Sequence, residues 1–171
     1  MRSAPRSAAE SQVLLNSLVA LLDESYSRQA WHGATLKGAL RGMSAQQAAW
    51  RPAPSRHSVA EIVVHAAYWK YAVRRRLSGG ERGGFPIKGS NWFAIDADVS
   101  EADWRGHIRL LDQQHAQLRI AVETMNPAHV ISTAEGRKVS NLRLIRGIAM
   151  HDVYHAGQVQ TLKALYKSAG S

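Results

Sequence analysis

Residues 140–167, SNLRLIRGIAMHDVYHAGQVQTLKALYK, carry the clearest sign of the fold. Apolar residues return every three or four positions, which is the period of an amphipathic helix; they are Leu144, Ile148, Val159 and Leu162. His151 and His155 fall on the same face, one helical turn apart, so both imidazoles point in the same direction. This stretch therefore predicts a long helix that turns two histidines toward a protein interior.

Three further stretches, at about residues 8–28, 58–77 and 100–125, show the same helical period. The alternation of apolar and polar residues that is typical of strands is missing throughout. Ser58 and Ser100 open two of these stretches, each with an acid three residues later, as in a capping box. Together the four stretches predict an all-α protein, a four-helix bundle with short extra helices between its first two long ones.

The longest connection, residues 79–99, is rich in glycine and turn formers. A connection of this length usually crosses a bundle or covers a site. Two capping-box signals, at Ser44 and Ser58, lie before and after a Trp-Arg-Pro turn at residues 50–52. We expect a brief helix after Ser44 and a long helix after Ser58.

The length of 171 residues fits one domain, and we expect residues 1–8 to be a flexible N-terminus. No stretch is long and apolar enough for a membrane span, and the first residues lack the apolar run of a secretory signal. A cytoplasmic location is therefore the default. Cysteine is absent, so any metal must be held by histidine and carboxylate, and disulfides are excluded.

The formal net charge is +9, and much of the excess lies at residues 51–76 and 137–167, with one acid in each window. Such a surplus favours anionic partners, either nucleic acid or an acidic small molecule. The ordinary interpretation is that these charges cover solvated helix faces.

The histidine pair has a natural partner in His65, which lies at the edge of the apolar face of the 58–77 helix. Two buried histidines without partners are costly, and a metal ion removes that cost. Bundles build metal sites from facing helices in this way. A site of His65, His151 and His155 leaves coordination positions open, as catalytic zinc sites do, and also suits nickel or iron.

The other histidines are weaker candidates. His115 lies on the core face of the 100–125 helix and is either a fourth ligand or simply packed there. His107 is expected to be exposed, and His32 either lines the mouth of a pocket or marks a turn. His57 and His129 gain no role from their spacing.

Two residues are candidates for a catalytic role. Glu61, one turn before His65, could orient a ligand or act as a general base, but its place in the Ser58 capping box explains it without chemistry. Arg146, or its neighbour Arg143, could hold an anionic substrate or cofactor. Asp152 is expected to point away from the histidine face, toward solvent.

Two motifs contain the candidate ligands: RHSVAEIVVH at residues 56–65, followed by AAYW, and HDVYHAGQ at residues 151–158. The first resembles the first histidine motif of the DinB/YfiT-like superfamily, and the second resembles that superfamily's second histidine motif. WHG at 31–33 and AAWRP at 48–52 are similar to segments of one subgroup. The resemblance covers residues 10–165, nearly the whole chain.

The resemblance implies a bundle with up-down-down-up topology, a crossover between the second and third long helices, and frequent homodimers. It also implies a nickel, zinc or iron site whose ligands, carried over by position, are His65, His151 and His155. Relatives of this kind include transferases and isomerases that depend on a low-molecular-weight thiol. A fold and a metal site do not by themselves decide function.

Three functions remain open at this point. The first is a metal-dependent enzyme acting on a small molecule, such as an organic anion, with hydrolase-like or thiol-transferase-like chemistry. The second is a non-enzymatic basic module that binds nucleic acid or a small anion around a structural metal. No helix-turn-helix or stacking motif supports a nucleic-acid partner. The third is a dimeric scaffold that binds a small molecule without turnover.

Overall fold

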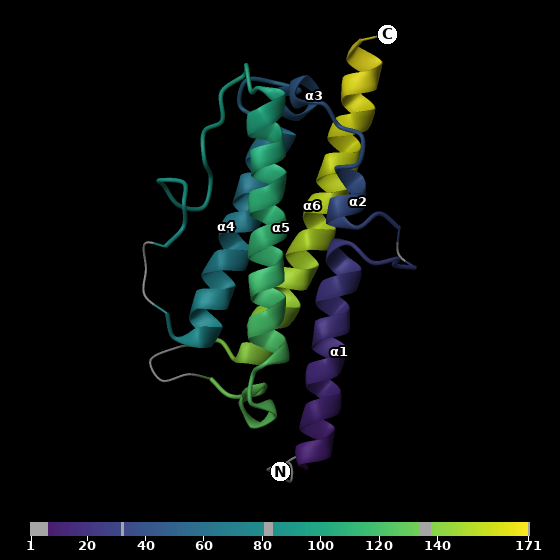
Figure 1. Ribbon diagram of the computed structural model, residues 1–171. Coiled ribbons are helices and arrows are strands. Elements are labelled where there is room, and N and C mark those ends of the chain that lie inside the picture. The colour runs from purple at the N-terminus through teal and green to yellow at the C-terminus, as the bar shows by residue number, and fades with distance from the viewer. Residues whose placement is uncertain (1–6, 32, 81–83, 134–137, 171) are drawn as a thin grey trace.

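The computed structural model describes residues 7–31, 33–80, 84–133 and 138–170 (Figure 1). Within these ranges the chain forms six α-helices, a turn of 3-10 helix and no β-strand. The four long helices are α1 (Ala8–Tyr26), α4 (Val59–Ser78), α5 (Glu101–Glu123) and α6 (Asn141–Ala169). The short elements are α2 (Leu36–Ala39), α3 (Ala45–Ala49) and the 3-10 turn η1 (Pro127–His129). The predicted all-α class is confirmed.

The long helices pack as a four-sided bundle in which α1 contacts α5 and α6, and α4 contacts the same two helices. Figure 1 shows that α1 and α6 run in one direction and that α4 and α5 run in the other. This arrangement fits the up-down-down-up order implied by the resemblance. Because α4 and α5 run the same way, the chain must travel the length of the bundle between them, which explains the long connection.

The helix ends follow the signals in the sequence. Ser44 and Ser58 each form a capping box, with Gln47 and Glu61 as the reciprocal partners. α4 ends at Gly79, whose φ of 73° is the left-handed conformation that glycine adopts without a steric cost. Six of the eight residues of the expected N-terminal tail, residues 1–6, lie outside the described residues.

The core consists of two apolar clusters, one toward each end of the bundle. One contains Leu36, Val63, Trp104 and Val159, and the other contains Leu18, Leu118 and Ile145. Among the helices of the described ranges, none combines the length and apolar character that crossing a bilayer demands.

One expectation about the core is wrong. Asp152 does not point toward solvent: it is completely buried and forms an ion pair with Lys70 of α4, which is also completely buried. The periodicity of α6 placed Asp152 one position away from the histidine face, where a polar residue usually faces water. The partner ammonium comes from a different helix, so only the packing of α4 against α6 explains the burial.

Candidate metal centre

The facing sides of α4 and α6 bring together the three histidines predicted as ligands. His65 comes from α4, and His151 and His155 come from α6, one turn apart. One nitrogen from each ring can be chosen so that the three atoms lie within 4.8 Å of one another. His65 and His155 are buried and His151 is half-buried, so the group is sheltered while part of it reaches the surface.

The Nε2 atoms converge. The Nε2 of His151 lies 3.1 Å from the Nε2 of His65 and 3.1 Å from the Nε2 of His155. An ion with tetrahedral bonds of about 2.0–2.1 Å separates its ligand nitrogens by about 3.3 Å. The observed spacing therefore suits a single small cation bound by three Nε2 atoms.

Two of the imidazoles are oriented through their other nitrogen. The Nδ1 of His65 donates to the backbone carbonyl of Asn91, at 2.8 Å, and the Nδ1 of His155 donates to the Oε1 of Gln158, at 2.6 Å. The Nε2 of Gln158 donates in turn to the hydroxyl of Tyr154, at 3.0 Å, which sets the direction of the amide. In both neutral rings the proton on Nδ1 leaves a lone pair on Nε2, the form that binds metal.

These protonation states make the cluster unfavourable without a cation. The Nε2 of His151 carries at most one proton, so it can donate to only one of the two lone pairs that face it. At least one 3.1 Å contact therefore places two lone pairs together. The Nδ1 of His151 is buried and has no hydrogen-bond partner among the described residues. The donor set and its geometry fit a divalent ion.

Burial keeps all three rings neutral at physiological pH. It lowers the pKa of His65 below the ordinary value. Burial, assisted by the neighbouring imidazoles, lowers the pKa of His151 to about 3 and that of His155 to about 4. Metal ions compete with protons for imidazole nitrogen, so a low pKa leaves the ligands available at neutral pH.

The connection between α4 and α5 covers the cluster. Besides the carbonyl of Asn91, it contributes Trp92, whose ring stacks on His65 with 3.9 Å between centroids and also on His57 with 3.6 Å. Asn91 has a φ of 61°, and its side chain accepts a hydrogen bond from Trp69 at 3.0 Å. Asparagine tolerates this left-handed conformation better than most residues. Through Asn91 and Trp92 this segment lies over the cluster, which agrees with one of the two roles expected for a connection of its length.

Glu61 is engaged by groups other than the histidine cluster. Its carboxylate accepts hydrogen bonds from the guanidinium of Arg51 and from the backbone N–H of Ser58, and its Oε2 lies 3.2 Å from the Nδ1 of His57. Burial alone raises the pKa of Glu61, but these hydrogen bonds outweigh it, and the pKa is lower than usual. The capping box expected at Ser58 is confirmed.

Arg146, the other catalytic candidate, is exposed on α6, as is Arg143. Arg146 precedes His151 by five residues, which on a helix of about 3.6 residues per turn directs it to a different face.

Among the described residues, the remaining histidines lie outside the cluster. His115 is buried and stacks on Tyr26 with 3.9 Å between ring centroids, and burial lowers its pKa to about 3. Of the two roles considered for His115, a fourth ligand or a packed core residue, the structure shows the packed one. His107 is half-buried, not exposed as expected, because it borders the end of the connection before α5. His129 is exposed, and His32 lies outside the described residues.

Sequence reasoning missed the residues that support the ligands. Gln158 follows His155 by three residues and so shares its face of α6, a spacing that could have suggested the contact. Asn91 and Trp92 lie in an irregular connection with no period, and they approach His65 only through the fold. The spacing of histidines identifies candidate ligands, whereas these neighbours depend on tertiary structure.

A helical bundle with a three-histidine cluster between two facing helices defines the class of protein. The family model described as the DinB superfamily matches residues 28–159, which is more than half of the chain and includes all three histidines. The chain belongs to the DinB superfamily. No curated protein and no solved structure matches the chain.

Proposed function

We propose that this protein is a metal-dependent enzyme in which His65, His151 and His155 hold one divalent ion, nickel, zinc or iron, with coordination positions left open. The observation that carries the proposal is the convergence of three Nε2 atoms, 3.1 Å apart in two pairs, with two rings oriented through Nδ1. Structural sites are usually closed by four protein ligands, whereas catalytic sites keep a position open. Only three protein ligands gather among the described residues.

A divalent ion bound there would lower the pKa of a bound water or thiol, or polarise a carbonyl group of a substrate. The protein's own residues prepare the site for it. The carbonyl of Asn91 and the amide of Gln158 hold two of the imidazoles in place. The ring of Trp92 covers His65 and keeps water from that side of the site.

The surroundings of the cluster favour a nucleophile that does not need a carboxylate as its base. No aspartate or glutamate belongs to the described cluster, and Glu61 is held by Arg51 and the cap of α4. Water in a hydrolase or a low-molecular-weight thiol in a transferase would satisfy this condition. Because the chain contains no cysteine, such a thiol would be a separate molecule.

Metal analysis of the purified protein tests the proposal. We expect about one divalent ion per chain, and we expect His65→Ala and His151→Ala to lose it. His129→Ala, which removes an exposed histidine of η1, is the matched control and should keep the metal. Wild-type metal content in both cluster variants, each shown to be folded by circular dichroism, would overturn the proposal.

Product analysis separates the two chemistries. The metal-loaded protein would be screened against electrophilic esters and halides with and without an added low-molecular-weight thiol. Turnover that requires the thiol and yields a thioether or thioester indicates a transferase. Turnover without thiol that yields an acid or alcohol indicates a hydrolase.

Binding of nucleic acid by the basic surface is the alternative function. Part of the positive charge is already engaged, because the guanidinium groups of Arg74 and Arg76 lie over the rings of Tyr71 and Trp69. A titration with duplex DNA at increasing salt decides the question, since binding through phosphates weakens steeply as salt rises. We also propose a homodimer, which light scattering would measure.

A further inference from the structure

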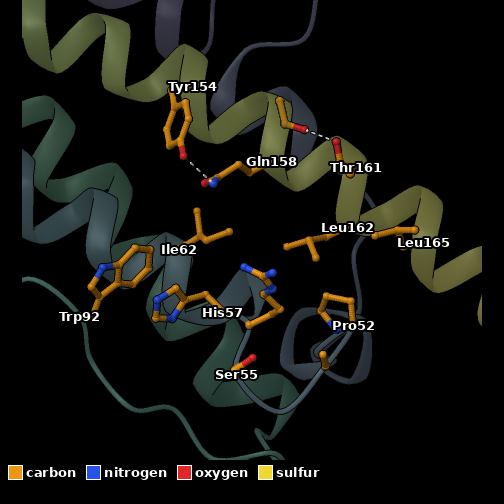
Figure 2. A pocket seen from close by; sticks show the side chains of 13 residues that line it. Pro52, Ser55, His57, Ile62, Trp92, Tyr154, Gln158, Thr161, Leu162 and Leu165 are labelled. Carbon is orange, nitrogen blue, oxygen red and sulfur yellow. Dashed lines mark hydrogen bonds between the residues drawn. The ribbon is translucent and has the colours of Figure 1, made fainter.

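A pocket of about 830 Å³ adjoins the histidine cluster, between α6 and the segment at residues 52–57 (Figure 2). Its volume lies within the range of about 300–1,000 Å³ that small-molecule sites occupy. Trp92 and Gln158 line the pocket and also contact His65 and His155. A molecule in the pocket therefore touches the same residues that cover and orient two of the candidate ligands.

Most of the pocket wall is apolar. Figure 2 shows Ile62 and Trp92 on one side and Leu162 and Leu165 of α6 on another, with Pro52 nearby. Burial of an aromatic or alkyl group against such a surface is favourable by about 25 cal/mol per Å². The walls suit a ligand with an apolar body.

The pocket is also positively charged. Arg56 lines it, and no aspartate or glutamate does. Arg51, five residues earlier, is engaged by Glu61 and by the carbonyl of Ile95, whereas no carboxylate pairs with Arg56 among the described residues. His57, the next residue, has its Nδ1 directed at Glu61. The guanidinium of Arg56 is therefore available to an anion, and arginine binds carboxylates strongly because its fork matches their two oxygens.

We infer that this pocket binds an amphiphilic monoanion, an aromatic or alkyl body that carries one carboxylate or a similar acidic group. The apolar body lies between Trp92 and Leu162, and the acidic group pairs with Arg56. That the anion is the substrate rests on the proposed function, whereas its binding in the pocket does not.

A matched pair of fluorescent probes tests the inference in metal-free, chelator-treated protein. The anion 1-anilinonaphthalene-8-sulfonate and the neutral N-phenyl-1-naphthylamine share the same rings and differ in the sulfonate. We expect one site for the anion, and Arg56→Gln should weaken its binding by about tenfold, the effect of losing a charge-assisted hydrogen bond. Binding of the neutral probe should not change. Arg109→Gln, an exposed arginine of α5 that does not line the pocket, is the control.

A second variant blocks the pocket without endangering the fold. Gly157 lines the pocket, and a Cβ added there meets nothing within 4 Å. Because leucine favours a helix more than glycine does, Gly157→Leu should fold and should abolish binding of both probes. Gly147→Leu, at an exposed position of the same helix with the same free space, should leave binding unchanged.

Equal affinity of the wild type and of Arg56→Gln for the anionic probe would overturn the inference. Binding of either probe by Gly157→Leu at the wild-type affinity would overturn it as well. Absence of binding to the wild-type protein would overturn it too.

The metal measurement is independent of these results. Probe binding that depends on Arg56 in a protein that takes up no metal would contradict the proposed function and leave the pocket assignment standing. A metal-binding protein that binds neither probe would overturn the pocket assignment and leave the proposed function standing.

Discussion

Lys70 of α4 and Asp152 of α6 form an ion pair in which neither side chain has any solvent-exposed surface. The ammonium of Lys70 also lies 3.3 Å from the Nδ1 of His115 and 4.8 Å from the centre of the Tyr26 ring. Burial lowers the pKa of Lys70 and raises that of Asp152, while the attraction between them opposes both shifts. Since Asp152 directly follows His151, the pair joins the two ligand-bearing helices beside the cluster.

Removing one member of this pair should be strongly destabilising. We expect Lys70→Met and Asp152→Leu each to lower the free energy of unfolding by about 3–5 kcal/mol, because each leaves a buried charge without a partner. The double variant should recover most of the loss, since two apolar side chains leave no charge behind. Urea unfolding of the metal-free proteins measures all three. Losses that simply add in the double variant would contradict this explanation.

Gln158 should control metal affinity without being a ligand. Its amide oxygen accepts the Nδ1 proton of His155, and loss of such a partner typically weakens metal binding by about 10–100-fold. We expect Gln158→Ala to show a loss of this size, and His155→Ala a larger one. Competition against a chromophoric chelator measures both. Gln160→Ala, an exposed neighbour on α6, is the control, and equal affinity in the two glutamine variants would contradict the role assigned to Gln158.

Mild acid should destabilise the metal-free protein. His115 and His151 have a pKa of about 3 and His155 of about 4 in the folded state, below the ordinary value of 6.5. Below pH 6.5 these histidines bind protons in the unfolded chain but stay neutral in the folded protein. Their contribution to the free energy of unfolding is therefore fully present above pH 6.5, and it is lost as the pH falls toward the pKa values of the folded state. Each such histidine contributes a slope of up to about 1.4 kcal/mol per pH unit.

Urea unfolding at several values between pH 7.5 and 5 measures this slope in chelator-treated protein. His115→Gln removes one of the groups and should reduce the slope while the metal cluster is unaltered. A free energy of unfolding that stays constant across this interval would show that the histidines are not buried as neutral rings.

Glu61 should matter for stability and not for metal binding. Its carboxylate caps α4 and pairs with Arg51. We expect Glu61→Ala to lower the free energy of unfolding by about 1–2 kcal/mol, the usual effect of losing a cap and its hydrogen bonds. The metal content, measured on the same samples, should stay at the wild-type level. Glu24→Ala on the exposed face of α1 is the control, and loss of metal in Glu61→Ala alone would assign the carboxylate to the site.

The order of the helices and their ends could be predicted from the sequence because these features depend on local chemistry. Helical periodicity and the capping boxes at Ser44 and Ser58 act within a few residues of the chain, and the observed helices begin where these signals stand. The candidate ligands His151 and His155 belong to the same category, because a spacing of four residues on one helix places them together before any packing occurs.

What surrounds these histidines was decided by tertiary structure. Asn91 and Trp92 reach His65 from a connection without periodicity, and Arg56 borders a pocket whose opposite wall is α6. Asp152 has the position of a surface residue on its own helix and is buried only because Lys70 approaches it from α4. The sequence by itself determined the helices and the pairing of His151 with His155, since those depend on neighbours along the chain. The orientation of the rings, their cover and the buried charge pair depend on contacts between residues far apart in the sequence, and only the packed bundle creates them.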